Sequence, residues 1–192
     1  MNFFQAIILG IVQALTEYLP VSSSAHIRII GDLMLGADPG AAFTAIIQIG
    51  TELSVILYFR RDIINILSHW FGCLFGKNGP DWRARMGRGD KYATLGWNVI
   101  VGSIPIIILG FTLQNIIETS LRNLWITVTV LFLFGLLLWI VDARSRQIKT
   151  MDDMNYRDAF LFGLGQSMAL IPGVSRSGGT ITVGRALGYT RE

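Results

Sequence analysis

The sequence predicts an all-α integral membrane protein, built as a polytopic helical bundle. Of its 192 residues, 52% are hydrophobic and only 15% are charged, whereas charged residues make up about a quarter of an ordinary soluble domain. Several apolar segments approach the roughly 20 residues that a helix needs to cross a bilayer. The basic residues gather in two loops, as in membrane proteins oriented by their cytoplasmic loops. The net charge of +3 is too small to indicate nucleic-acid binding, and a lone cysteine excludes an internal disulfide.

Five apolar segments are expected to form the helices of a single transmembrane domain over residues 1–192. They are residues 3–21, 41–59, 93–113, 124–141 and 159–174. The third and fourth contain no charged residue, and the first two contain one each, Glu17 and Glu52. The fifth is short and is interrupted by glycines and by Pro172, which predicts a broken helix. Residues 63–75 are expected to form an amphipathic helix on the inner surface or a short re-entrant segment.

The basic residues predict the orientation of these segments. Seven Lys or Arg lie in residues 60–91 and four in residues 142–158, against one each in residues 22–40 and 114–123. Cytoplasmic loops carry the excess of Lys and Arg, and two segments separate the basic loops, so both can be cytoplasmic. Residues 20–26, PVSSSAH, are then expected on the outer side of the inner (cytoplasmic) cell membrane.

Two stretches of the chain resemble each other at a constant offset. Residues 10–24, GIVQALTEYLPVSSS, and residues 163–177, GLGQSMALIPGVSRS, share Gly, Gln, Val and two Ser at matching positions. Each ends an apolar helix in a proline and opens into a turn rich in hydroxyls. We interpret them as two copies of a repeat, the first over roughly residues 1–141 and an incomplete second over roughly 159–192, although two similar helix ends can also match by chance. Interrupted helices at corresponding places in two halves point to a site at the repeat interface.

Polar side chains inside the apolar segments are the first candidates for that site. Glu17 is a carboxylate within an apolar helix, which is costly and indicates a function. Gln13 lies one turn earlier on the same face of that helix. Gln48 and Glu52 repeat this spacing in the next segment, although such pairs can also serve only to hold helices together.

The turns themselves carry hydroxyls that can cap the next helix or bind a ligand: Ser22, Ser23, Ser24, Ser175 and Ser177. Capping alone is the simpler interpretation of the first three. Arg176 stands between two serines and is followed by Gly178, so that an arginine, hydroxyls and bare amides meet at a helix start, a set suited to phosphate. With His26 as an acid/base or nucleophile and Glu17 as a carboxylate, the combination predicts phosphoryl transfer.

These motifs resemble those of a known family. The stretches QALTEYLPVSSSAH and PGVSRSGGT are similar to the signature motifs of the bacterial undecaprenyl-diphosphatases, the bacitracin-resistance proteins, and the similarity extends over the whole chain. Members are membrane hydrolases that convert undecaprenyl diphosphate to undecaprenyl phosphate, the lipid carrier of peptidoglycan synthesis, on the outer side of the membrane. The resemblance implies the same activity here, interlocked inverted repeats with re-entrant helix pairs, a homodimer, and a divalent cation, Mg²⁺ or Ca²⁺. Relatives continue after the arginine motif, so we expect the chain to be truncated at its C-terminus.

The resemblance also implies roles for single residues. Arg176 is expected to clamp the diphosphate, Glu17 to serve the cation or the acid/base step, and either Ser23 or His26 to be the nucleophile. The other serines of the motifs and one glycine are expected to bind the substrate: Ser22, Ser24, Ser175, Ser177 and Gly178.

The expected cation ligands are Glu17 and, beside it, Gln13. Many relatives carry glutamate where this chain has Gln13, which removes one carboxylate from the site. Glu52 stands where others often have an apolar residue, so the hypothesis is that Glu52 compensates for Gln13 as a further cation ligand.

A transporter or flippase of an anionic polyprenyl lipid is the alternative that the sequence leaves open. Broken helices, inverted repeats and polar residues at membrane depth fit that function nearly as well. A different class of lipid phosphatase, related to the vanadium haloperoxidases, needs a histidine and an aspartate after its Ser-Arg pair. No histidine or aspartate follows Arg176 in this chain. Release of phosphate from a polyprenyl diphosphate separates an enzyme from a transporter.

Overall fold

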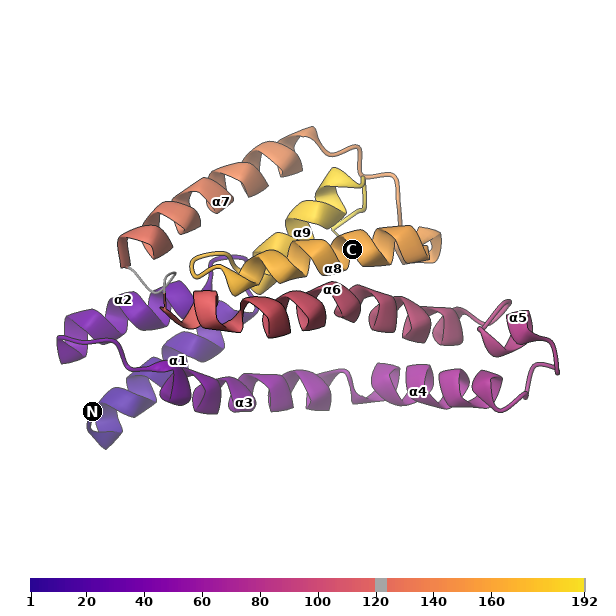
Figure 1. Ribbon diagram of the computed structural model, residues 1–192, viewed down its shortest axis with the longest axis horizontal. Helices are drawn as coiled ribbons and strands as arrows, with labels where there is room; N and C mark the ends of the chain where they lie inside the picture. The colour runs from indigo at the N-terminus through magenta and orange to yellow at the C-terminus, as the bar shows by residue number, and fades with distance from the viewer. Residues whose placement is uncertain (120–123, 192) are drawn as a thin grey trace.

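The computed structural model describes residues 1–119 and 124–191, and these residues are nearly all helical. The α-helices are α1 (Phe3–Glu17), α2 (Ser23–Leu35), α3 (Ala41–Tyr58), α4 (Arg60–Leu74), α5 (Trp82–Arg85), α6 (Lys91–Thr119), α7 (Leu124–Arg144), α8 (Tyr156–Ser167) and α9 (Arg176–Ala186). Two short 3₁₀ helices, η1 (Met151–Asp153) and η2 (Met168–Leu170), precede and follow α8. Figure 1 shows the longer helices side by side as an elongated bundle.

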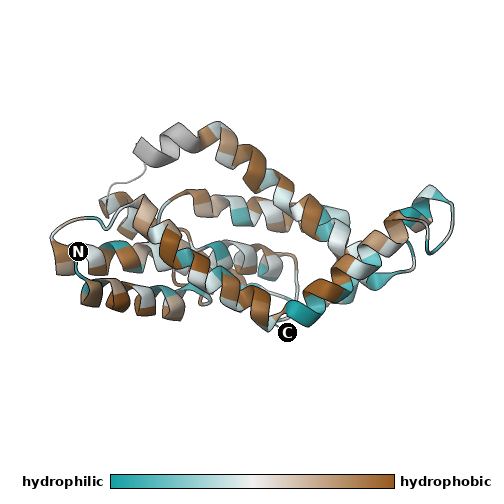
Figure 2. Cartoon of the chain, turned by 90° about the horizontal axis from the view of Figure 1, so that it is seen from below, coloured by the Kyte–Doolittle hydropathy of each residue, from teal (hydrophilic) through white to brown (hydrophobic). Residues whose placement is uncertain are grey.

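Three helices in the described part of the chain are long and apolar enough to cross a membrane. They are α3, the segment Lys91–Leu113 of α6, and α7. Large apolar side chains point outward from them, with Phe111 83% and Trp125 80% exposed, as expected where lipid rather than water is the solvent. Hydrophobic residues cover the long helices, and hydrophilic ones gather in the loop around α5 (Figure 2). The polytopic all-α prediction and the spans expected at 41–59, 93–113 and 124–141 are confirmed.

The segments expected at 3–21 and 159–174 are not spans but arms of two hairpins. The 15 residues of α1 measure about 22 Å, less than the roughly 30 Å of a bilayer core. After α1 the chain turns back at Pro20, where the Val21 N–H donates to the Leu19 carbonyl at 2.8 Å, and continues as α2 against α1. Residues 20–26 therefore form the tip of a hairpin within the bundle, and the expectation that they follow a complete span is wrong. Apolar length alone could not distinguish a span from such an arm.

The two hairpins enter the bundle from opposite ends, and their tips meet. In Figure 1, α1 starts and α2 finishes at the end that holds the N-terminus, whereas α8 starts, and α9 finishes, on the side toward α5. The Ser177 hydroxyl on the second tip donates to the Leu19 carbonyl on the first at 3.0 Å. The loop around α5 and residues 145–155, which carry much of the basic charge, lie at the end from which α8 and α9 enter. This is the geometry of re-entrant helix pairs in inverted orientation.

Glycines allow the backbone of α8 to come into direct contact with the backbones of α6 and α9. A Cβ atom on Gly163 of α8 would lie 2.1 Å from the Gly102 carbonyl oxygen of α6, and one on Gly179 of α9 would lie 2.4 Å from the Gly165 carbonyl oxygen. Helices in membranes associate largely through such close packing of small residues. These contacts hold the second hairpin between α6 and α9.

Replacing Gly163 by alanine is expected to destabilise the protein by roughly 1–3 kcal/mol, because the added methyl group overlaps backbone that cannot move aside cheaply. The measurement is the thermal unfolding midpoint in detergent. Gly10→Ala in α1 is the matched control, because nothing lies within 4 Å of its Cβ position, and alanine there favours the helix. Equal midpoints for the two variants would contradict the close packing of α8 on α6.

Helix α4 runs alongside α6 and is not a separate helix lying across the inner ends of the membrane-spanning helices. Trp70 packs edge-on against Trp97 with ring centroids 5.3 Å apart. The His69 Nδ1–H donates to Asp90 Oδ2 at 2.8 Å, and Asp90 Oδ1 accepts from the Ala93 N–H at the start of α6. Burial raises the pKa of Asp90, but the hydrogen bonds from His69, Ala93 and Asn78 and the charge of His69 together lower it by more, so the pKa lies below its ordinary value. The contacts explain why α4 lies beside α6, an arrangement different from the expected helix on the inner surface.

Candidate active site

The residues of the two sequence motifs meet in one cavity, between the tips of the hairpins and the flank of α3. The cavity has a volume of about 180 Å³. Its lining residues are Gln13, Glu17, Ser22, Ser23, Ser24, Thr44, Gln48, Ala169, Val174, Ser175 and Arg176. Most of the predicted site residues are therefore brought together, although the two motifs lie about 150 residues apart in the chain.

A hydrogen-bonded group of Gln13, Glu17 and Ser23 forms the first hairpin's part of the cavity wall. The Ser23 hydroxyl donates to Glu17 Oε2 at 2.5 Å, and the Gln13 amide donates to the same oxygen at 2.8 Å. Gln13 and Glu17 point the same way because they lie four residues apart on α1. Ser23 reaches Glu17 because the chain reverses at Pro20 and starts α2 beside the end of α1. A serine hydroxyl on a carboxylate is the arrangement of a nucleophile with its base.

The two tips share a pair of hydroxyls at the positions that the sequence match aligns, although their backbones differ. Ser22 precedes the first residue of α2 and Ser175 the first residue of α9, and each pairs its hydroxyl with the serine two residues on, Ser24 at 3.2 Å and Ser177 at 2.9 Å. Only Ser175 is a side-chain cap, accepting from the Gly178 N–H at 3.1 Å. Arg176 occupies the position in the second tip that Ser23 occupies in the first.

Capping does not explain the buried residue Ser22. Its hydroxyl makes no cap hydrogen bond to α2, and its φ of 62° lies in the region that favours glycine. A non-glycine residue held there costs on the order of 1–3 kcal/mol, and such strain clusters at functional sites. The simpler interpretation of the first serines, that they merely cap a helix, is thus wrong for Ser22.

Arg176 lines the cavity from the first turn of α9 and also makes an ion pair with α3. Its Nη1 lies 3.0 Å from Glu52 Oε1, and the two side chains are 47% and 49% exposed. Glu52 does not line the cavity. The structure thus places Glu52 with the arginine, and not with Gln13 as the cation hypothesis requires.

Three further candidates lie outside the cavity. His26 lies one turn along α2, where its Nδ1–H donates to the Ser22 carbonyl oxygen at 2.9 Å. The Ser177 hydroxyl is directed to the other tip, and the Gly178 N–H is already used by Ser175. Gly178 is a packing position, because a Cβ there would lie 2.9 Å from Ser175 Cβ.

The sequence pointed to α3 through Gln48 and Glu52, but it assigned only Glu52 a role in the site and did not single out Thr44. Thr44 and Gln48 both line the cavity. Together with Glu52 they recur every four residues, on one face of the helix. The spacing of Gln48 and Glu52 could have indicated that this face of α3 reaches the cavity. Nothing in the sequence indicates that Ala169, which belongs to η2, also reaches it.

The donors around Gln13 fit a hard divalent cation. The Oε1 atom of Gln13 is buried, has no hydrogen-bond partner, and belongs to a side chain that lines the cavity. The Glu17 carboxylate lies beside it. Mg²⁺ is commonly held by one or two carboxylates with water and substrate phosphates completing its shell. The described residues contain no group of three or more His, Cys, Asp or Glu side chains suited to a metal, so the protein alone offers only a partial shell.

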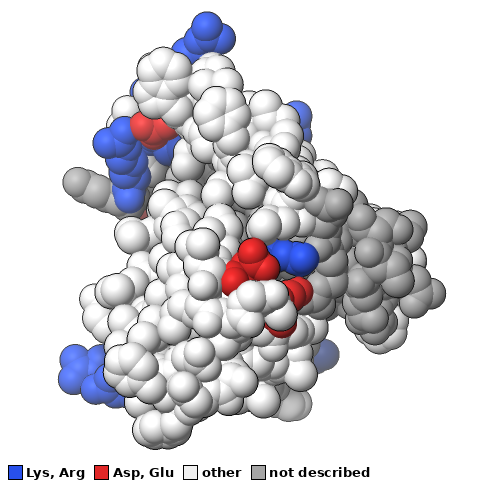
Figure 3. Space-filling view, turned by 90° about the vertical axis from the view of Figure 1, so that its left-hand side faces the viewer, with Lys and Arg blue, Asp and Glu red and all other residues white. Residues whose placement is uncertain are grey.

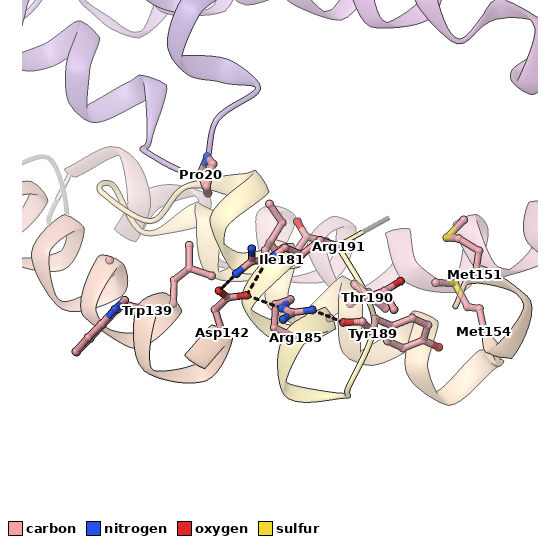
Figure 4. A pocket seen from close by; sticks show the side chains of 15 residues that line it. Pro20, Trp139, Asp142, Met151, Met154, Ile181, Arg185, Tyr189, Thr190 and Arg191 are labelled. Atoms are coloured by element: carbon pink, nitrogen blue, oxygen red, sulfur yellow. Dashed lines mark hydrogen bonds and ion pairs between the residues drawn. The ribbon is translucent and has the colours of Figure 1, made fainter. Parts of the chain in front are cut away.

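A larger cavity of about 670 Å³ between α7, α9 and residues 189–191 is not the candidate site (Figure 4). Its charged groups pair with one another: Arg185 Nε donates to Asp142 Oδ1 at 2.6 Å and Arg185 Nη1 to the Tyr189 carbonyl oxygen at 2.6 Å, while Arg191 pairs with the other Asp142 oxygen. None of the motif hydroxyls or carboxylates that sequence analysis singled out lines it.

Comparison with known proteins agrees with the motifs. The family described as "Bacitracin resistance protein BacA" matches residues 6–192. Proteins named undecaprenyl-diphosphatase are similar over the whole chain, with 89% identity in Bifidobacterium longum subsp. infantis, 71% in Bifidobacterium adolescentis and 54% in Micrococcus luteus. The chain spans 65% of the length of the first two relatives and 66% of the third.

Proposed function

The chain belongs to the BacA family of bacitracin resistance proteins, and from this premise we propose that the full-length protein hydrolyses undecaprenyl diphosphate to undecaprenyl phosphate and phosphate. This reaction would recycle the lipid carrier of peptidoglycan synthesis and so confer bacitracin resistance. The observation that carries the proposal is the 2.5 Å hydrogen bond from Ser23 to Glu17 in a cavity that Arg176 also lines.

The cavity suits the diphosphate and not the polyprenyl chain. Its volume of about 180 Å³ is below the roughly 300–1,000 Å³ of pockets that hold drug-sized ligands. Its lining supplies a guanidinium at the start of α9 and hydroxyls from both tips. Helix starts and arginines attract phosphate oxygens. The apolar chain would remain outside the cavity.

The geometry favours Ser23 over His26 as the nucleophile. The Ser23 oxygen would attack the terminal phosphorus while its proton passes to Glu17, and the bond from that phosphorus to the bridging oxygen would break. Undecaprenyl phosphate would leave, and water would then hydrolyse the phosphoserine to release phosphate. Arg176 would stabilise the charge on the transferring phosphoryl group. His26 would act through its hydrogen bond to Ser22, as a positioning residue for the tip.

A divalent cation would be held by Glu17 and the unpaired Gln13 oxygen, and when bound it would neutralise charge on the diphosphate. Removal of divalent cations with a chelator is expected to abolish phosphate release, and Gln13→Ala to raise the cation concentration for half-maximal rate by about tenfold. Gln48→Ala is the matched control, because Gln48 bonds to Glu52 at 3.4 Å and not to Glu17. The same cation requirement in wild type and Gln13→Ala would remove Gln13 from the site.

The proposed location is the cell membrane, with the site open to the outer side. A second cavity, of about 360 Å³, shares Ser24, Thr44 and Gln48 with the first and extends to Asp38 and Ala41, before and at the start of α3. The loop between α2 and α3 and the start of α3 lie in the half of the molecule away from α5 (Figure 1). Seen from that end, the surface is mostly uncharged, with a small group of acidic and basic side chains near its centre (Figure 3). A homodimer remains a prediction.

The test is phosphate release by the purified full-length protein from undecaprenyl diphosphate in detergent. The expected result is release that depends on protein concentration and on the Ser23 and Arg176 side chains. A folded protein that releases no phosphate would overturn the proposal and favour transport of an anionic polyprenyl lipid.

A further inference from the structure

One carboxylate beside the cavity has no part in the proposed chemistry. Glu52 lies in the second half of α3 and its Oε1 atom is 3.0 Å from Arg176 Nη1, across 124 residues of sequence. Arg176 lines the cavity and Glu52 does not. The arginine proposed to bind phosphate therefore already has an anionic partner on a neighbouring helix.

This ion pair is placed to open readily. Both side chains are about half exposed, and ion pairs between exposed groups contribute little to stability. Within residues 1–119 and 124–191, Glu52 accepts one other hydrogen bond, a long one of 3.4 Å from the Gln48 amide. A phosphate anion, which takes a bidentate guanidinium contact well, can thus compete with Glu52 for Arg176.

We propose that Glu52 competes with the phosphates of the lipid for Arg176 and thereby favours release of the products. The inference rests on the proposed hydrolysis. The diphosphate gathers its negative charge on one group, whereas cleavage divides that charge between undecaprenyl phosphate and phosphate. Each product then binds the guanidinium of Arg176 less strongly than the substrate did, and the ion pair between Glu52 and Arg176 forms again. Glu52 is a positioning residue, since it acts through Arg176.

Glu52→Gln in the full-length protein is the test, because glutamine keeps the shape of the side chain and removes its charge. The inhibition constant of undecaprenyl phosphate is expected to fall by roughly two- to fivefold, the range that an exposed ion pair can supply, and the KM for undecaprenyl diphosphate is expected to fall as well. Asp38→Asn is the matched control: it also removes a carboxylate, one that pairs with Arg28 at 3.5 Å, and should leave both constants unchanged.

A binding measurement separates this inference from the proposed function. Binding of undecaprenyl phosphate to the detergent-solubilised protein is compared for wild type, Glu52→Gln, Arg176→Ala and the double variant. Glu52→Gln is expected to tighten binding when Arg176 is present and to have no effect when it is absent. Unchanged binding in Glu52→Gln, or an equal gain without Arg176, would overturn the inference even if the enzyme releases phosphate. Absence of phosphate release from wild type would instead count against the proposed function.

Discussion

Ser23→Ala in the full-length protein is expected to lower kcat for phosphate release by at least about 10³-fold, the largest effect of any single change in the cavity. Alanine removes the oxygen that would form the bond to phosphorus and leaves water as the only attacking group. The Ser23 hydroxyl is the one that donates to Glu17, at 2.5 Å. Steady-state kinetics give kcat, and acid quenching followed by mass spectrometry locates the phosphorylated residue.

Two neighbours of Ser23 serve as controls. Ser24 also lines the cavity, but its hydroxyl pairs with Ser22 and not with Glu17, so Ser24→Ala is expected to lower kcat by about tenfold or less. His26→Ala is expected to have a similarly modest effect, because His26 acts only on the Ser22 carbonyl. A loss in His26→Ala that exceeds the loss in Ser23→Ala, with phosphate trapped on the histidine, would reverse the assignment.

Arg176→Ala is expected to lower kcat/KM by about 10²–10³-fold, because a donor aimed at developing negative charge is lost. Arg176→Lys should recover only part of the rate, since an ammonium group cannot make the two parallel hydrogen bonds of a guanidinium. Arg28→Ala is the matched control, removing an arginine of α2 that lines the neighbouring cavity instead. Equal losses in the two alanine variants would show that general positive charge, and not the position of Arg176, is what matters.

The membrane class and several of the residues that line the cavity could be predicted because each leaves a local mark in the sequence. Long apolar runs predicted α3, α6 and α7, the first of them interrupted only by Glu52. Glu17, Ser23 and Arg176 stood out because polar groups in apolar surroundings are costly. The serine pairs at the two tips followed from residues at matching positions.

The depth of the hairpins depends on long-range packing, which leaves no local mark in the sequence, and the contribution of α3 to the cavity was marked only by the Gln48–Glu52 spacing. A 19-residue apolar segment gives the same hydropathy whether it crosses a bilayer or turns at Pro20. The Glu52–Arg176 ion pair joins residues 124 positions apart. The sequence next to either residue does not indicate that the other is its partner. The sequence also did not predict that His26 lies outside the cavity, because this depends on which face of α2 lies toward the cavity.

The meeting of the two tips has a consequence for biosynthesis. The hydroxyl and carboxylate lie on the first hairpin and the guanidinium on the second, so the ribosome must add about 150 residues between them. At roughly 5–20 residues per second, this takes on the order of ten to thirty seconds. During that interval the first hairpin has left the ribosome without the arginine. Ser23, the proposed nucleophile, thus meets Arg176, its proposed phosphate-binding partner, only once the second hairpin has been inserted from the opposite end. The proposed phosphate release would therefore require both hairpins to be in place.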